Sequence, residues 1–354
     1  MSTRLPSDRT ARDLDPEDTQ HAVELLGSLA LTRGQVIHAA VKLGVVERLG
    51  DEPVDVEVLA GDLDLDPAAT RRLCRALAVY GVLEAHADGG YSLTPVGRHY
   101  REEHPASMRD VVLYGLGPER RLASRHLPDI VAEGGPNGYE REFGCSFFEY
   151  CERNPSFGEH FNGTQQLLTS RVTPAVLDGL DAFDFGRFET VCDVGGGHGY
   201  LLSHLLDAEP GLEGTVLELP SVVAEADRHW AAELGVEDRC TYAAGDMFEA
   251  VPAADLYLMK YILHDWTDDE CVEILSTTAA SAPAGARLLV VESVVDAEDP
   301  SPEAVDLDMV MLMETTGRER TEAEYRSLLA AAGWDLLEVW GTEQHVSVIE
   351  ASVA

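Results

Sequence analysis

A glycine-rich stretch follows a predicted strand and could hold a nucleotide-like ligand. Asp193 ends the apolar run 190–194, and glycines follow at positions 195, 196, 197 and 199, directly before an apolar helical pattern. A backbone without side chains lets a ligand lie on such a strand-to-helix turn, where the helix N-terminus faces it. The stretch therefore predicts the binding loop of a nucleotide-like cofactor.

The spacing of the glycines separates the kinds of cofactor. A dinucleotide fingerprint needs glycine at its first, third and sixth positions, but the sixth position counted from Gly195 is Tyr200. No Gly-Lys-Ser/Thr follows, so the phosphate loop of nucleotide hydrolases does not fit either. The remaining pattern, acid-x-Gly-x-Gly-x-Gly, resembles the first motif of class I S-adenosylmethionine-dependent methyltransferases. It is formed by Asp193, Gly195, Gly197 and Gly199.

Further polar residues close the predicted strands that follow. Glu218 ends the second strand and could accept both hydroxyls of a ribose. Asp246 could accept from an adenine amine, and the thioether of Met247 could pack on the ring. Lys260 closes the fourth strand. Ligands bind at the carboxyl ends of strands in open α/β sheets, so we expect one adenosine site here. A surface glutamate in an acidic chain is the alternative for Glu218.

Strands and helices alternate from residue 190 onward, which predicts a parallel sheet flanked by helices. The last two strands share a short connection and predict a terminal antiparallel hairpin. The predicted fold class is therefore α/β, a Rossmann-like class I methyltransferase domain. We expect strands at 190–194, 215–219, 240–244, 255–260, 286–293, 335–339 and 345–349, and helices at 199–207, 222–234, 268–281 and 321–332.

The residues before this domain read as mostly helical. Helical patterns at 17–33 and 36–49 lead into a helix–helix–hairpin order that resembles a winged helix. Residues 51–100 hold nine acidic residues against four arginines, so dimerisation is favoured over DNA binding. We expect a dimerisation domain over 1–104, a helical connecting segment over 105–185 that contributes to an acceptor pocket, and the catalytic domain over 186–354.

An ordered set of motifs makes the resemblance more specific. The glycine loop is followed by Leu217–Pro220, Gly245–Phe248, Ile262–Trp266 and Gly317–Thr321. Together they look like the O-methyltransferases related to plant caffeate and hydroxyindole methyltransferases and to bacterial polyketide methyltransferases. The resemblance spans about residues 20–350.

The resemblance implies roles for particular residues. Gly195, Gly197 and Gly199 would hold the methionine part of S-adenosylmethionine, with Asp193 before them. Glu218 would hold the ribose, where the family usually has Asp; Asp246 and Met247 would bind adenine, and Lys260 would lie against the cofactor. His264 would be the general base, flanked and oriented by Glu292 and Glu319. No metal is implied.

The pKa values of a phenol and an imidazole indicate how His264 would act as a base. A phenol of pKa ~10 and an imidazole of pKa ~6.5 differ by about 3.5 units, or roughly 5 kcal/mol for full proton transfer. Proton removal would therefore accompany attack on the methyl group. A nearby carboxylate stabilises the imidazolium and makes the base stronger.

The predicted function is methyl transfer from S-adenosylmethionine to a hydroxyl of a small aromatic or isoprenoid-derived metabolite, by a homodimer. The acceptor's identity stays open, because Thr315–Arg318 and Arg120–Ala123 depart from family patterns. One alternative is methylation of carbon or nitrogen, or a homologue that does not transfer methyl groups. Another is a winged-helix regulator that binds a ligand, and a nicotinamide-dependent dehydrogenase competes at the level of the fold.

Composition bears on partners and compartment. The chain has 64 acidic and 26 basic residues, a net charge of −38, which would repel nucleic acid and anionic membranes. The six cysteines form no C-x-x-C pair, and no apolar run approaches the ~20 residues of a membrane span. With no secretory signal visible at the N-terminus, we expect a cytoplasmic protein.

The acidic surplus predicts dependence on salt. Near 1 M salt, screening over ~3 Å makes such self-repulsion tolerable, as in the cytoplasm of a halophile. Dialysis from molar to low salt is expected to lower both the helical circular dichroism signal and the activity, and returning the salt should restore them. Unchanged folding and activity after dialysis would contradict this prediction.

Overall fold

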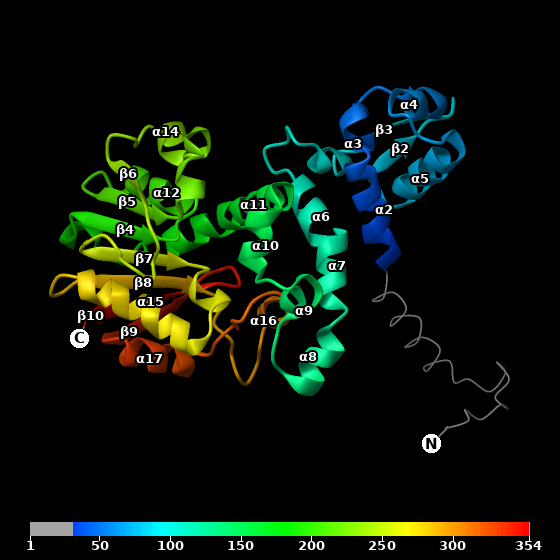
Figure 1. Ribbon diagram of the computed structural model, residues 1–354. Helices are drawn as coiled ribbons and strands as arrows, with labels where there is room; N and C mark the ends of the chain where they lie inside the picture. The colour runs from blue at the N-terminus through cyan, green and yellow to red at the C-terminus, as the bar shows by residue number, and fades with distance from the viewer. Residues whose placement is uncertain (1–30, 354) are drawn as a thin grey trace, which may run out of the picture. The chain divides into compact units, whose positions relative to one another are not determined.

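The computed structural model describes residues 31–353, which fall into two compact units that divide the chain after Gly117 (Figure 1). The helix expected from residue 17 lies outside the described residues up to residue 30. The three-segment division at residues 104 and 185 stays a prediction. Among the described residues, no helix is both long and apolar enough to cross a membrane.

The N-terminal unit has the predicted helix–helix–hairpin order. Asp66 caps the N-terminus of α5, where its Oδ1 accepts from Ala69 N at 2.7 Å and Pro67 occupies the first turn. The hairpin pairs with a short third strand in the order β1-β3-β2, all antiparallel. The elements are α2 (Leu31–Lys42), α3 (Val45–Arg48), β1 (Val54–Asp55), α4 (Val56–Asp62), α5 (Pro67–Val79), β2 (Leu83–Ala85), β3 (Gly90–Leu93), the 3-10 helix η1 (Gly97–Tyr100) and α6 (Arg109–Gly115).

The second unit opens with helices, as predicted for this segment. The chain turns between α8 and α9, where Asn137 caps α9 in a capping box with Glu140. Tyr139 and Phe147 pack edge to face at 5.0 Å between ring centroids, and Tyr139 is fully buried. The helices are α7 (Pro118–Ser124), α8 (Leu127–Glu133), α9 (Gly138–Phe143), α10 (Phe147–Arg153) and the long α11 (Pro155–Gly179), followed by η2 (Phe185–Arg187).

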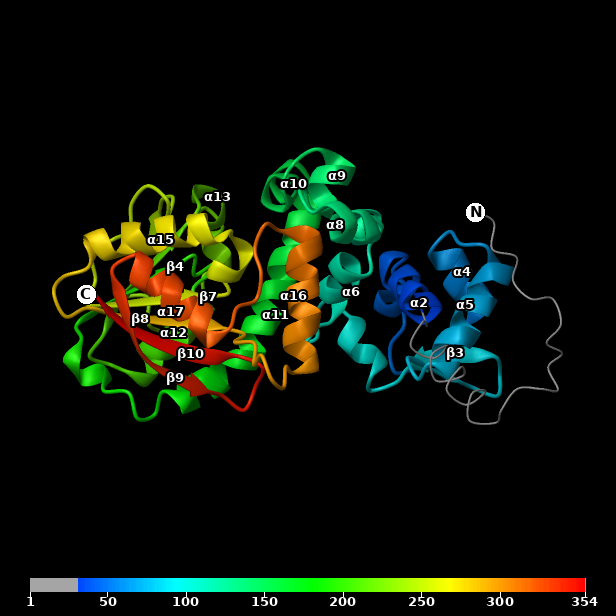
Figure 2. The same cartoon turned by 90° about the horizontal axis from the view of Figure 1, so that it is seen from below.

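A seven-stranded sheet forms the centre of the second unit, in the order β6-β5-β4-β7-β8-β10-β9. The first five strands in this order are parallel, and β10 runs antiparallel to β8 and to β9. The predicted terminal hairpin is therefore present at one edge (Figure 2). The strands are β4 (Thr190–Val194), β5 (Glu213–Glu218), β6 (Cys240–Ala244), β7 (Leu256–Lys260), β8 (Arg287–Glu292), β9 (Trp334–Gly341) and β10 (Ser347–Val353).

Helices cover both faces of this sheet, because alternate side chains of its buried strands feed two separate cores. One core joins α11, α12 (Tyr200–Ala208) and α14 (Trp230–Leu234) to side chains such as Val191 and Leu258. The other joins α15 (Asp268–Ser281) and α17 (Glu322–Ala331) to the opposite face, at residues such as Cys192 and Met259 (Figure 1).

Two features differ from the sequence prediction. The single helix expected at 222–234 is wrong: the segment forms α13 (Pro220–Val223), the 3-10 helix η3 (Ala226–Arg228) and α14. The chain bends there because His198 holds it twice, its Nε2 2.9 Å from the Glu225 carboxylate and its carbonyl accepting from Trp230 N at 3.1 Å. A helix that was not predicted, α16 (Pro302–Glu314), packs against α7 and α9.

Candidate active site

A cavity of ≈ 760 Å³ opens at the carboxyl ends of β4, β5, β6 and β7. Its lining includes every predicted cofactor residue except Gly199, and also side chains from α10 and α11. This is the edge at which open parallel sheets bind ligands. The cavity therefore combines the predicted cofactor site with space for a second molecule.

The glycine loop leaves room for a ligand at the place where the sequence predicts one. A Cβ on Gly195 would lie 2.4 Å from Ile262 Cδ1, and one on Gly199 would lie 2.6 Å from the Tyr242 hydroxyl. Gly197 lines the cavity with φ +58°, and its Cβ position has nothing within 4 Å. Packing thus requires two of the glycines, and the third keeps the backbone bare toward the cavity.

Glu218 reaches back onto this loop. Its two carboxylate oxygens accept from Gly197 N at 3.0 Å and from Leu219 N at 2.7 Å. Burial raises the pKa of Glu218, while these hydrogen bonds act in the opposite direction. Each oxygen keeps a lone pair for a further donor. The glutamate in place of the usual aspartate is thus long enough to tie strand, loop and cavity together.

Asp193 and Lys260 lie on neighbouring strands beneath the loop. Asp193 is buried, and burial raises its pKa to about 7 although Lys260 draws it down. Burial lowers the pKa of Lys260 to about 8, against the attraction of Asp193, Glu292 and Asp265. A Cβ on Gly196 would lie 2.5 Å from Asp193 Oδ2, so this glycine is required as well. Asp193 supports the loop from below.

Asp246 and Met247 both line the cavity. Asp246 Oδ1 accepts from Phe248 N at 2.9 Å, which fixes the carboxylate at the start of the turn after β6. The carboxylate, the thioether, Glu218 and the bare loop together match the polar and apolar groups of an adenosine with an amino-acid tail.

His264 sits in the 3-10 helix η4 (Leu263–Asp265) and is 4% exposed. Its Nδ1 lies 2.7 Å from Glu319 Oε1 and 3.7 Å from Glu292 Oε2. Because a carboxylate only accepts, Nδ1 carries the proton of the short contact and Nε2 is the basic nitrogen. His264, Glu292 and Glu319 are not among the residues that line the cavity. Nε2 lies 3.7 Å from Asp265 Oδ1, and Asp265 lines the cavity.

Besides facing His264, Glu292 accepts hydrogen bonds from the backbone of the turn that carries this histidine. The residue is fully buried at the end of β8, and its Oε1 accepts from Ile262 N at 3.0 Å and Leu263 N at 2.9 Å. One carboxylate therefore fixes the backbone of η4 and places negative charge beside the imidazole. The ligand atoms of His264, Glu292 and Glu319 lie within 4.8 Å of one another. The shortest of these contacts, between His264 Nδ1 and Glu319 Oε1, is a hydrogen bond.

The neighbouring carboxylates make His264 a stronger base than the free imidazole assumed from the sequence. Burial alone would lower the pKa of His264, but Glu292, Asp265 and Glu319 outweigh it and raise the pKa to about 10. Burial raises the pKa of Glu292 to about 7 and that of Asp265 to about 6. The pKa gap to a phenol, about 3.5 units for a free imidazole, is thereby nearly closed.

Sequence reasoning missed two residues beside His264. Asp265 belongs to the motif but received no role. Tyr261 has φ +54°, which is strained for a residue other than glycine. Its ring stacks on His264 at 5.2 Å, and its hydroxyl lies 2.8 Å from His345 Nε2. No local pattern signals a left-handed tyrosine, and its partner His345 is distant in sequence.

Comparison with known proteins places these features in a family. Residues 124–335 match the O-methyltransferase domain, and residues 25–103 match the O-methyltransferase dimerisation domain. A phenazine O-methyltransferase of Lysobacter antibioticus is 35% identical over 321 residues, which cover 90% of this chain and 92% of the relative.

The chain belongs to the O-methyltransferase family. The class I methyltransferase fold and the S-adenosylmethionine-dependent O-methyltransferase activity predicted from the sequence are confirmed. The alternatives of a dehydrogenase and a winged-helix regulator are not supported. The roles of the individual site residues remain predictions.

Two further similar proteins are described by the cofactor that one binds and by the atom that the other methylates. The structure of human N-acetylserotonin methyltransferase in complex with S-adenosylmethionine superposes with a TM-score of 0.82 at 28% identity, covering 97% of this chain and 99% of that one. An 8-amino-8-demethylriboflavin N,N-dimethyltransferase of Streptomyces davaonensis is 30% identical over 345 residues, 95% of this chain and 98% of the relative.

The raised pKa of His264 predicts an alkaline pH dependence. Only the neutral imidazole accepts a proton, and its fraction grows as the pH rises toward about 10. The value of kcat/KM for the acceptor is expected to keep rising above pH ~7. A plateau that begins near the ordinary histidine pKa of ~6.5 would contradict this prediction.

Glu292→Gln separates charge from geometry in the same measurement. The amide oxygen can still accept from Ile262 N and Leu263 N, but the negative charge beside His264 is lost. The pH at which the rate levels off is therefore expected to fall. Glu322→Gln, which changes an exposed carboxylate on α17, is the matched control and should leave the profile unchanged.

Proposed function

We propose that this chain transfers the methyl group of S-adenosylmethionine to a hydroxyl of a small aromatic acceptor, with His264 as general base. The observation that carries the proposal is the 2.7 Å contact between His264 Nδ1 and Glu319 inside a buried cluster with Glu292. This contact fixes the tautomer and leaves Nε2 as the basic nitrogen.

The protein's part in the reaction is alignment and proton transfer. The cofactor supplies an electrophilic methyl group on a sulfonium when it is bound. The glycine loop, Glu218 and Asp246 orient it, and Asp193 balances Lys260 beneath it. His264 Nε2 would take the proton of the acceptor hydroxyl as its oxygen accepts the methyl group, whose bond to the sulfonium breaks to leave a neutral thioether. The buried carboxylates would stabilise the imidazolium that forms.

The acceptor part of the cavity is formed by aromatic rings and amides. Phe148 stacks on Trp266 with 5.7 Å between centroids, and both line the cavity. Asn162, Gln165 and Gln166 lie at helical spacing on α11 and line it as well. Rings favour a flat acceptor, and the amides would hydrogen-bond its polar substituents. The name of the phenazine O-methyltransferase relative is compatible with such a molecule.

The charge of the residues that line the cavity restricts the class of acceptor molecules further. Glu152 and Glu159 line the acceptor side, and Asp265 lies next to the base, while Lys260 is the only lysine or arginine among the lining residues described. A carboxylated or phosphorylated acceptor would meet repulsion there. The acceptor we propose is therefore neutral or cationic.

A nitrogen acceptor is the second candidate, because one relative is an N,N-dimethyltransferase. A neutral amine attacks without losing a proton first, so it has little need of a base whose pKa is raised to about 10. The His–Glu–Glu cluster therefore favours a hydroxyl.

The proposal is tested by His264→Ala with labelled S-adenosylmethionine in molar salt. Loss of the base is expected to lower kcat with a neutral hydroxyarene by about 100-fold or more. Binding of S-adenosylmethionine, measured by calorimetry, should change by less than about 2-fold, since His264 is not among the residues that line the cavity. Near-normal turnover by the variant would overturn the proposed role.

Two comparisons complete this experiment. His204→Ala changes a half-buried histidine on α12 and is expected to retain turnover. The hydroxyarene should be preferred over its carboxylated analogue at equal concentration, and a preference for the carboxylate would contradict the acceptor class. Mass analysis of the product identifies the methylated atom.

We also propose that the working form is a homodimer. The support is the match of residues 25–103 to the dimerisation domain of the family. Sedimentation in molar salt is expected to give twice the chain mass of 38.5 kDa. A single chain mass across the concentration range used for assays would contradict the dimer.

A further inference from the structure

Arg320 is a fully buried cation outside the cavity. An arginine side chain carries five N–H donors, and burying it is costly unless they are satisfied. Here the guanidinium donates four hydrogen bonds and also forms an ion pair with Asp268. Its Nε and one terminal nitrogen contact Asp268 Oδ1 at 3.0 and 2.9 Å, and its remaining donors reach the backbone carbonyls of Leu263, Trp266 and Arg318 at 2.8, 2.8 and 3.3 Å.

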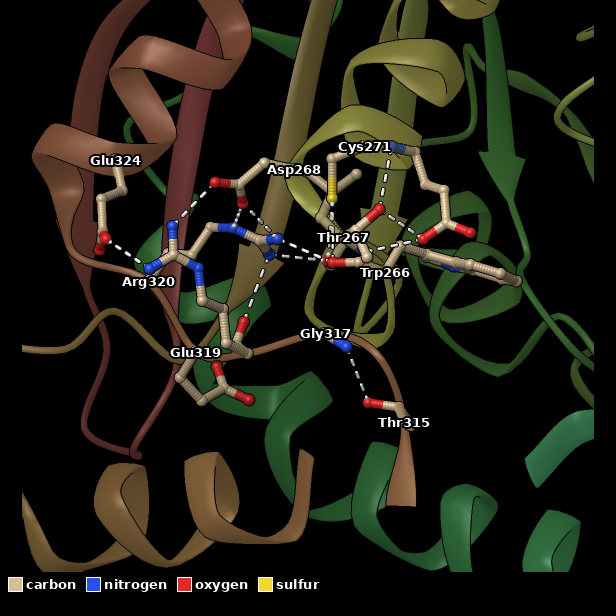
Figure 3. A network of polar contacts seen from close by, with 12 residues as sticks. Trp266, Thr267, Asp268, Cys271, Thr315, Gly317, Glu319, Arg320 and Glu324 are labelled. Atoms are coloured by element: carbon tan, nitrogen blue, oxygen red, sulfur yellow. Dashed lines mark hydrogen bonds and ion pairs between the residues drawn. The ribbon is translucent and has the colours of Figure 1, made fainter. Parts of the chain in front are cut away.

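Two of these carbonyls flank the catalytic histidine. Leu263 precedes His264, and Trp266 ends the 3-10 helix that carries it. Figure 3 shows the Arg320 side chain beside Asp268 and Trp266, with Glu319 next to it. On the other side of the same turn, Glu292 accepts from the N–H groups of Ile262 and Leu263. A buried cation thus holds the carbonyls of the turn while a buried anion holds its N–H groups.

The segment that carries Glu319 depends on the same residue. The backbone of Arg320 bridges to Val294, and its carbonyl accepts from Val295 N at 3.0 Å, which ties the segment to the end of β8. Close by, a Cβ on Gly317 would lie 1.9 Å from the carbonyl oxygen of His264. The two chain segments that form the His264–Glu319 contact therefore run against each other backbone to backbone, and Arg320 joins them.

We propose that Arg320 is a positioning residue for the general base: through its forked contacts it sets the distance between His264 and Glu319, and Asp268 holds the guanidinium in place. The inference rests on the proposed role of His264 and adds to it a residue that touches neither cofactor nor acceptor. Misplacing a catalytic group by about 1 Å can cost about 100-fold in rate.

Arg320→Lys tests this, because lysine keeps the charge but loses the planar fork. Asp268→Asn, at a half-exposed side chain, is a milder variant that decides the matter if the first one does not fold. Both are expected to lower kcat, Arg320→Lys by about 10- to 100-fold. The binding of S-adenosylmethionine should stay within about 2-fold of the parent, because Arg320 does not line the cavity.

Arg318→Lys is the matched control. Arg318 also pairs with Asp268, at 2.8 Å, but it contacts no carbonyl of the His264 turn and is half exposed. Its variant is expected to keep the parent kcat. An equal loss of kcat in Arg318→Lys and Arg320→Lys would show general damage to the network and would overturn the proposal.

A double variant separates positioning from structural support. If Arg320 acts through His264, adding Arg320→Lys to His264→Ala should lower the residual rate by less than about 2-fold, whereas it lowers the parent rate at least about 10-fold. Equal fold losses in both backgrounds would overturn the proposal. Near-normal turnover by His264→Ala alone would instead refute the proposed function, so the two failures are distinguishable.

Discussion

The buried carboxylate of Glu292 is the constraint on which the site depends. A carboxylate removed from solvent has to be compensated, and here two backbone N–H groups and a nearby imidazole do so in part, while burial still raises the pKa of Glu292 to about 7. Meeting this requirement holds residues 262–266, which follow β7, in one tight turn beside the end of β8. The turn then presents His264 to Glu319 and places Tyr261 in its left-handed conformation. Geometry and basicity at His264 therefore have the same cause.

The cavity is built by two different means. Its cofactor side relies on backbone: a loop of glycines, strand ends and one glutamate that bonds the loop. The side that we propose for the acceptor relies on side chains of α10 and α11, which contribute aromatic rings and amides. The backbone part leaves few residue choices, as the Cβ clashes at Gly195, Gly196 and Gly199 indicate.

Whether a feature of the fold or the site could be predicted depends on how far apart in the sequence the interacting residues lie. The strand, glycine loop and helix around Asp193 are local in sequence, so their pattern sufficed, and family motifs supplied His264, Glu292 and Glu319. Arg320 could not be found in this way, because its partners Leu263, Trp266 and Asp268 lie 52 to 57 residues earlier in the chain. The helix expected at 222–234 failed for a similar reason: apolar spacing continues, but the tertiary contact of Glu225 with His198 bends the chain.

Lys260 is one of only two lysines in the chain, the other being Lys42 on the surface of the N-terminal unit. In most proteins an amine-directed reagent modifies many surface lysines, so the modification gives little information about the active site. Here burial lowers the pKa of Lys260 to about 8, so the neutral, nucleophilic share of its amine at pH 7 exceeds that of an ordinary lysine, at the wall of the cavity. Acylation of this chain would thus act as a footprint of the cofactor pocket, with Lys42 and the N-terminal amine as internal references.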